Sequence, residues 1–172
     1  MASLLGNTSF FTKKSLIGMV HVQALPGTPA NRYSLKEIIE IAVREAQILE
    51  AVGFDMIEIE NMHDTPYLRR NVGPEIVASM TAICAAVRGA IHIPFGLLTY
   101  TLLFPTQHLY MLGIQILAGA NKEAIAVALA TGASFIRSEG FVFSTVADEG
   151  IMDSDAGFSL PELLHVKLLL RI

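Results

Sequence analysis

The chain has 172 residues, of which 52% are hydrophobic and 16% are charged, and its formal net charge is −4. These values predict a folded domain with a sizeable core and exclude an intrinsically disordered chain. Because the balance is acidic and no basic stripe occurs, nucleic acid is not expected as a partner. The single Cys84 excludes an internal disulfide, and its place in a helical apolar pattern favours a buried thiol over a nucleophile.

The N-terminal segment, residues 1–14, is interpreted as an extension. No basic region precedes its apolar residues, which argues against a secretory signal. The segment has no acidic residue and carries Lys13 and Lys14, a composition compatible with a mitochondrial transit peptide. We therefore expect a cytoplasmic protein, with a mitochondrial location as the alternative.

Strand and helix patterns alternate from residue 15 onward. The β-rich run 15–22 leads into a turn, and 54–61 is the second predicted strand. Between them a helix is predicted to start after Ser34, where Glu37 three residues later completes a capping box. Gly53 suits the left-handed position that follows a helix.

The same order continues to the end of the chain. Pro74 suits the first turn of a second helix that ends at Gly89. The later elements are a third strand that starts at 91–96, a third helix from the N-cap Asn121 to Gly132, a fourth strand at 134–140 and a C-terminal helix within 158–172. Strands that alternate with amphipathic helices predict parallel βαβ units.

Residues 89–121 carry no charged side chain and are long enough to cross a bilayer. However, Pro105, Gln107 and His108 interrupt the apolar run, and no basic cluster flanks it. We therefore predict an irregular apolar insertion at 97–113 beside a buried strand, and no membrane span.

The chain also repeats part of its own pattern, because "GFDMIEIE" at 53–60 aligns with "GASFIRSE" at 132–139. Together with the alternation, this repeat favours a partial (β/α) TIM-type barrel of about four βα units over a doubly wound sheet. No glycine-rich dinucleotide fingerprint or phosphate-binding P-loop follows the first strand. The predicted barrel occupies 15–157.

Polar residues follow the apolar part of three strands. In a barrel, alternate strand residues face the interior, and those near the carboxyl ends line the mouth where active sites lie. The residues predicted there are His21, Gln23, Glu58, Glu60, Arg137 and Glu139. We predict Glu60 and Glu139 as acid–base groups and His21 as a polarising group. Two alternatives stay open: a structural ion pair between Glu58 and Arg137, and a core role for His21.

Further acidic residues lie in the loops after the second and fourth strands. Asn61, His63 and Asp64 follow the second strand, and the later loop holds Asp148, Glu149 and Asp153. Clustered carboxylates suit acid–base chemistry or a hard divalent ion, so Mg²⁺ is the candidate cofactor. No zinc motif occurs, and no residue is assigned as a metal ligand. The alternative for the later loop is a solvated surface loop.

A small anionic metabolite is the predicted ligand. The turn 118–123 opens a helix whose amides, together with Asn121 and Lys122, would bind an anion, although Asn121 equally suits plain N-capping. The other predicted substrate-binding residues are Gln23, Asn61, Asp64 and Arg137.

Several motifs in order resemble the BtpA family. They are "LIGMVHVQALPGTP", "DMIEIENMHDTPY" with "VGPEIVASM", "IQILAGANKEAIAVALATGASFIRSEGF" and "VADEGIMDSDAG". The resemblance covers 15–157 and implies a TIM barrel of the ribulose-phosphate-binding kind. The family's cyanobacterial namesake is implicated in photosystem I accumulation. The resemblance implies a fold but does not imply a particular reaction.

Two departures separate this chain from the family pattern. The insertion at 97–113 interrupts the third strand, and 158–172 reads as a divergent C-terminal helix. A complete barrel needs about 250 residues, so the pattern predicts an incomplete or alternatively spliced member that lacks catalysis through truncation. Its two open sheet edges predict a homo-oligomer or a protein partner that covers them. A non-catalytic assembly factor is the alternative to an enzyme.

Overall fold

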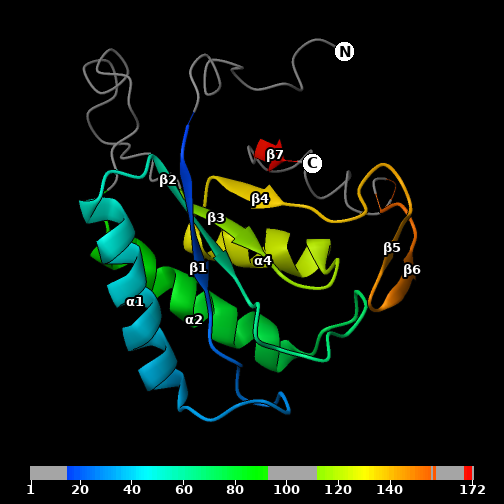
Figure 1. Cartoon of the computed structure of the whole chain (residues 1–172), viewed down its shortest axis with the longest axis horizontal. Helices are drawn as coiled ribbons and strands as arrows, with labels where there is room; N and C mark the ends of the chain where they lie inside the picture. Colours follow the sequence, from blue (N-terminus) through cyan, green and yellow to red (C-terminus); the bar gives the residue numbers. More distant parts are fainter. Residues whose placement is uncertain (1–14, 93–111, 156, 158–168, 172) are drawn as a thin grey trace.

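The computed structural model describes residues 15–92, 112–155, 157 and 169–171 (Figure 1). Three helices alternate with a parallel sheet, and a small hairpin follows. The strands are β1 (Ile17–His21), β2 (Met56–Glu60), β3 (Leu112–Gln115), β4 (Phe135–Arg137), β5 (Thr145–Ala147), β6 (Gly150–Met152) and β7 (Leu169–Arg171). The helices are α1 (Leu35–Ala51), α2 (Pro74–Ala90) and α4 (Asn121–Thr131).

The helix boundaries follow the predicted signals closely. At α1 the Ser34 hydroxyl accepts a hydrogen bond from the Glu37 amide, and the Glu37 carboxylate accepts one from the Ser34 amide, which confirms the capping box. The Ser34 hydroxyl also donates to the Glu37 carboxylate at 2.7 Å, and this hydrogen bond, followed by the one from the Ser34 amide, lowers the pKa of Glu37. Gly53, with φ of +91°, follows α1, and Pro74 is the first residue of α2. The helix starts are therefore set by local chemistry.

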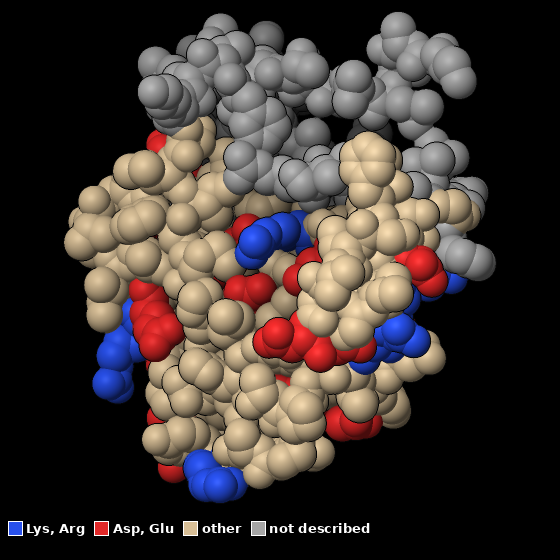
Figure 2. Space-filling model, turned by 45° about the vertical axis from the view of Figure 1, so that its right-hand side comes forward, with Lys and Arg blue, Asp and Glu red and all other residues tan. Residues whose placement is uncertain are grey.

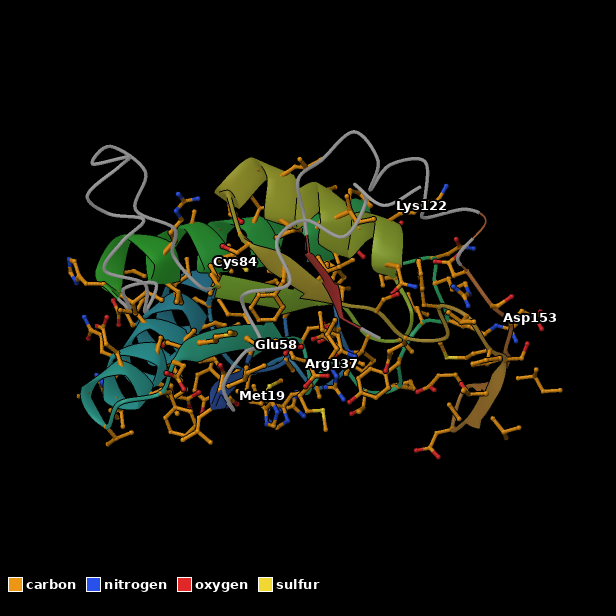
Figure 3. The ribbon with its side chains drawn as sticks, turned by 90° about the horizontal axis from the view of Figure 1, so that it is seen from above. Met19, Glu58, Cys84, Lys122, Arg137 and Asp153 are labelled. Carbon is orange, nitrogen blue, oxygen red and sulfur yellow. The ribbon has the colours of Figure 1, made fainter. Side chains whose placement is uncertain are left out.

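The main sheet has the order β1-β2-β3-β4-β7, and each neighbouring pair is parallel. The helices α1, α2 and α4 form one layer on one face of this sheet, with α2 between the other two (Figures 1 and 3). A doubly wound sheet has helices on both faces. The sequential strand order with one helical layer is compatible with a partial (β/α) barrel.

The hydrophobic core lies between the sheet and this helical layer. Alternate strand residues face the helices and are completely buried, namely Val20, Ile57, Ile59, Leu112, Ile114 and Ile136. Cys84 of α2 is part of the same core, and burial strongly raises the pKa of its thiol. The prediction of a buried core cysteine is confirmed.

The C-terminal residues differ from the prediction. A helix was predicted within 158–172, but Leu169–Arg171 form strand β7, which pairs in parallel with β4. A strand edge presents unpaired amide and carbonyl groups, and β7 satisfies them along β4. The β4 edge, which was predicted to be open, is therefore paired, and β1 and β7 are the two terminal strands of the described sheet.

The apolar segment 89–121 can be described only in part. Residues 93–111, which hold most of the predicted insertion at 97–113, lie outside the described residues, whereas Leu112 and Gly113 belong to β3. In the part of the chain that the structure describes, no helix is long and apolar enough to cross a membrane.

Candidate functional site

One row of polar side chains crosses the carboxyl ends of four neighbouring strands, on the sheet face without helices. The strand register places His21 beside Glu60, and Glu60 beside Gln115. Their strands are parallel, so these ends meet at one edge of the sheet, where ligands bind in open and closed α/β sheets. We call His21, Glu60, Gln115 and Arg137 the polar row.

The buried Glu60 carboxylate stands at the centre of the polar row. Its Oε2 atom lies 3.4 Å from His21 Nε2, and its Oε1 atom lies 3.8 Å from Arg137 Nη1. The Glu60 side chain is only 6% exposed, whereas the side chains of His21 and Arg137 are 45% and 52% exposed. Two half-exposed basic groups are therefore held by one buried acid.

Gln115 is a member of this row that the sequence pattern does not reveal. It is buried, and its Oε1 atom accepts a hydrogen bond of 2.9 Å from Arg137 Nη1. The internal repeat aligns Arg137 with Glu58, but in the structure Arg137 lies level with Glu60 and forms its ion pair there. The two-residue offset arises because a sequence repeat does not fix the stagger of neighbouring strands.

A second row lies one layer below the polar row and forms its floor. The register brings Met19 beside Glu58, Glu58 beside Gly113, and Gly113 beside Phe135. A Cβ atom on Gly113 would overlap the Phe135 ring, so the glycine makes room for this ring. Figure 3 shows Met19, Glu58 and Arg137 on the side away from the helices.

Asn61 and Asp64 form hydrogen bonds to each other and to backbone amides of neighbouring loops. The Asp64 Oδ1 atom accepts a hydrogen bond from the Leu25 amide at 2.7 Å, and the Asn61 Oδ1 atom accepts one from the Leu117 amide at 2.8 Å. The Asn61 side-chain amide donates to Asp64 Oδ2 at 2.8 Å. Burial raises the pKa of Asp64, against the lowering effect of these hydrogen bonds. The pair ties together the loops that follow β1, β2 and β3.

Glu139 and Asn121 form a second tie between loops. Glu139 Oε2 accepts a hydrogen bond of 2.6 Å from the Gly119 amide, so this turn already holds a carboxylate of the chain itself. Asn121 is the first residue of α4 and follows the N-cap Ala120, which corrects its predicted capping role. Its side-chain amide donates to the Glu139 carbonyl oxygen and to Asp155 Oδ2.

Arg70 extends this tie to the β5–β6 hairpin. Its Nη1 atom lies 3.1 Å from Asp155 Oδ1, and its Nη2 atom donates to the Asp153 carbonyl oxygen. The positive φ of Arg70, +63°, accompanies a hydrogen bond from its amide to the Ala118 carbonyl oxygen. Neither Arg70 nor Asp155 stands out in the sequence, because each is contributed by a loop whose path only the fold decides.

The side chains of the remaining predicted residues take no part in the loop-to-loop hydrogen bonds described above. Gln23 is half-buried two residues after β1, and Lys122 is exposed at the start of α4, away from Glu58 and Arg137 (Figure 3). His63 and Asp153 are exposed, and Asp148 is exposed between the strands of the hairpin. The placement leaves Lys122 outside the polar row.

Burial and neighbouring carboxylates raise the pKa values of two side chains near the strand ends, Glu139 and Tyr67. Burial raises the pKa of Glu139, and the nearby Glu60 raises it further. Tyr67, which the sequence pattern does not single out, has its pKa raised by burial first and then by Glu60, Glu149 and Asp64. Figure 2 shows acidic and basic side chains gathered around a hollow on this side of the molecule. Within residues 15–92 and 112–155, no group of three or more His, Cys, Asp or Glu residues is arranged to hold a metal ion.

A parallel sheet with one helical layer places this chain in the class of α/β proteins, and its ionisable groups lie at the carboxyl ends of the strands. The BtpA family model matches residues 12–100 and 108–170. The chain belongs to the BtpA family. The unmatched residues 101–107 lie inside the predicted insertion, and the second matched range includes most of 158–172, which the motif pattern predicts to diverge.

The curated relatives come from animals, archaea and cyanobacteria. An uncharacterised mitochondrial protein of Caenorhabditis elegans is 45% identical over 83% of this chain and 47% of its own length. An uncharacterised protein of Archaeoglobus fulgidus is 34% identical over 84% of this chain and 51% of its own length. The photosystem I biogenesis protein BtpA of Synechocystis is 30% identical over 86% of this chain and 46% of its own length. The chain thus spans about half the length of these relatives.

Proposed function

We propose that the four βα units form part of a (β/α) barrel whose mouth binds a small phosphorylated metabolite and supports acid–base chemistry on it. The observation that carries this proposal is the polar row, in which four successive strands direct His21, Glu60, Gln115 and Arg137 to one edge of the sheet. Groups from different strands that converge at the carboxyl edge are the usual source of catalytic residues in such folds.

Arg137 is the proposed anchor for the anionic group of the ligand. Its Nη1 atom is directed to Gln115 and Glu60, which fixes the plane of the guanidinium group. About half of the side chain is exposed, and a guanidinium group offers five donors in a fork that matches phosphate and carboxylate oxygens. Glu60 and Glu139 are the carboxylates that the sequence predicts for acid–base chemistry, and Mg²⁺ is the cofactor that it predicts.

The binding step can be tested by titrating the chain with inorganic phosphate and a panel of sugar phosphates, followed by ³¹P NMR. Arg137→Gln should weaken binding about tenfold or more, because the loss of one charge-assisted contact is equivalent to about 1.5–3 kcal/mol. Arg44→Gln is the matched control, since Arg44 is exposed on α1, in the helical layer on the other face of the sheet. Equal binding by both variants would contradict the anchor.

A second candidate function is that of an assembly or partner-binding factor, and the β5–β6 hairpin favours it. Val146 and Ile151 are cross-strand neighbours in this hairpin and are 85% and 60% exposed, and the preceding Phe143 is 77% exposed. Clustered apolar side chains at a surface mark interaction sites. The name of the Synechocystis relative, a photosystem I biogenesis protein, also fits such a factor.

The two candidate functions predict different results for two variants. If the hairpin binds a partner or a second copy of the chain, Val146→Lys with Ile151→Lys should abolish the association seen by sedimentation velocity, and Arg137→Gln should leave it intact. If the site is enzymatic, the lysine variants should keep phosphate binding.

Two further points concern the whole protein. Because the chain spans about half the length of its relatives, we propose that it supplies one part of the mouth and that turnover needs the remainder of a longer family member. The name of the Caenorhabditis elegans relative supports a mitochondrial location as the alternative to a cytoplasmic one. Expression of a fluorescent fusion with and without residues 1–14 would distinguish the two locations.

A further inference from the structure

We propose that His21, rather than Glu60 or Glu139, exchanges a proton with the bound ligand, and that Glu60 acts as its positioning residue. This inference rests on the function proposed above, since it takes the polar row as the ligand site. It reverses the roles predicted from the sequence, in which the two carboxylates are the acid–base groups and His21 is the polarising group.

Glu60 is poorly placed to reach a ligand. Its side chain is 6% exposed, and each of its oxygen atoms faces a different basic group, His21 at 3.4 Å and Arg137 at 3.8 Å. A buried carboxylate that contacts a different basic side chain through each oxygen atom holds both side chains in place. Its geometry therefore suits orientation of its neighbours.

Glu139 is engaged elsewhere. Its Oε2 atom accepts the Gly119 amide at 2.6 Å, and its own backbone is held by Asn121 through the amide and the carbonyl oxygen. These contacts place Glu139 in the tie between the loop after β3, the start of α4 and the loop after β4. The carboxylate fixes the shape of the rim.

His21 has both a fixed and an open side. Its Nε2 atom faces Glu60, while 45% of the side chain is exposed at the edge of the sheet. A neutral imidazole carries one N–H, and a carboxylate beside Nε2 favours the proton on that nitrogen. The Nδ1 atom then keeps its lone pair and serves as the base, which is the arrangement of a histidine oriented by a carboxylate.

The proposed step is a proton transfer at a ligand anchored by Arg137. Nδ1 accepts a proton from an O–H group, or from a C–H group beside a carbonyl, and the electron pair stays on the ligand as an oxyanion or enolate. The imidazolium ion that forms lies beside the Glu60 carboxylate, and Arg137 lies on the other side of Glu60, within reach of the developing negative charge. Return of the proton to a different ligand atom restores the neutral histidine.

Alkylation with iodoacetate tests this assignment without knowledge of the ligand. The reagent carries a carboxylate that Arg137 would guide, and the imidazole nitrogen with the free lone pair forms the N–C bond as the C–I bond breaks and iodide leaves. Peptide mass spectrometry gives the rate at each histidine, and NMR of the product identifies the modified nitrogen. His63, which is exposed in the loop after β2, is the internal control.

In the wild-type chain we expect carboxymethylation at Nδ1 of His21, about tenfold faster than at His63, because a fixed cation raises the local concentration of an anionic reagent. Glu60→Gln should give a mixture of Nδ1 and Nε2 products, since the amide can either accept from or donate to Nε2. The matched control Glu40→Gln, at an exposed position of α1, should react like the wild type.

The outcomes separate this inference from the proposed function. Modification of His21 at Nε2 in the wild type, or an unchanged product in Glu60→Gln, would overturn the assignment of the base, whereas a wild-type rate no higher than that of His63 would count against the anion anchor. If Arg137→Gln leaves the iodoacetate rate unchanged, the anion anchor fails while the assignment of the base stands. Neutral iodoacetamide, whose rate should not depend on Arg137, controls for a change in His21 itself.

Discussion

The two faces of the main sheet are built from the same strands but differ in their chemistry. The face toward α1, α2 and α4 presents aliphatic side chains that are completely buried, whereas the other face presents His21, Glu58, Glu60, Gln115 and Arg137. Alternate strand residues point to opposite faces, so one short run of sequence supplies both. The difference teaches that the helical face provides the stability and leaves the other free to hold charged groups.

The largest loss of stability should follow a deletion on the helical face. Ile114 is completely buried within the core, and Ile114→Ala should reduce the free energy of unfolding by about 2–5 kcal/mol because it removes packed methyl groups and leaves a cavity. Ile114→Val is the milder control, with an expected loss of about 0.5–1.5 kcal/mol. Chemical denaturation measures both, and equal losses would show that the site collapses around the smaller side chain.

An added methyl group on the open face should have the next largest effect. In Gly113→Ala the new Cβ would overlap the Phe135 ring, so the ring must move from the floor of the polar row. Overpacking of this kind costs about 1–3 kcal/mol. The matched control is Gly89→Ala in α2, where an added Cβ meets no atom within 4 Å. A Gly113→Ala chain as stable as the wild type would mean that the floor is not tightly packed.

The stability of the chain should depend on pH through the partly buried Glu139 carboxyl group near the carboxyl ends of the strands. Burial raises the pKa of Glu139, so the folded chain binds this proton more tightly than the unfolded chain does. Its contribution to stability is therefore complete below the unfolded pKa of about 4.3 and is lost as the pH rises through the higher folded pKa.

Glu139→Gln should remove this loss, because glutamine keeps an oxygen that accepts the Gly119 amide but does not ionise. The stability of the variant relative to the wild type should thus increase as the pH rises above about 4. Denaturation at a series of pH values checks this, with Glu40→Gln on the exposed side of α1 as the control. A constant difference between Glu139→Gln and the wild type across the range would contradict the predicted linkage.

The smallest change in stability is expected at Arg137. Its side chain is half-exposed and its ion pair with Glu60 is long, so Arg137→Gln should alter the free energy of unfolding by only about 0–1 kcal/mol. The same change should have the largest effect on phosphate binding. A loss of several kcal/mol in the thermal or chemical denaturation of this variant would instead assign Arg137 to the core.

Part of the fold was predictable because its signals are local. The Ser34–Glu37 capping box and Pro74 mark the starts of α1 and α2 by chemistry that acts within one helical turn. The alternation of apolar and charged residues in β2 predicted that Glu58 and Glu60 share a face, since the side-chain period of a strand is two. The C-terminal helix predicted within 158–172 was wrong at Leu169–Arg171, where pairing with β4 outweighs the local preference of a leucine-rich run.

The candidate site was predictable only in its composition. His21, Glu60 and Arg137 were expected at the strand ends and do come together, whereas Asn61, Asp64 and Asn121 form ties between loops. Gln115, Arg70 and Asp155 were not expected, because their partners lie 22 to 85 positions away and no short motif records such contacts.

The sequence by itself determined where the helices begin and which strand residues are apolar or charged, because capping and side-chain alternation depend on neighbours within a few residues. Only the tertiary structure decided that Glu60 rather than Glu58 meets Arg137, that Glu139 accepts the Gly119 amide, and that the last strand pairs with β4. The stagger between strands and the path of loops are set by the packing of the whole sheet on its helices, and no local stretch of the chain contains that information.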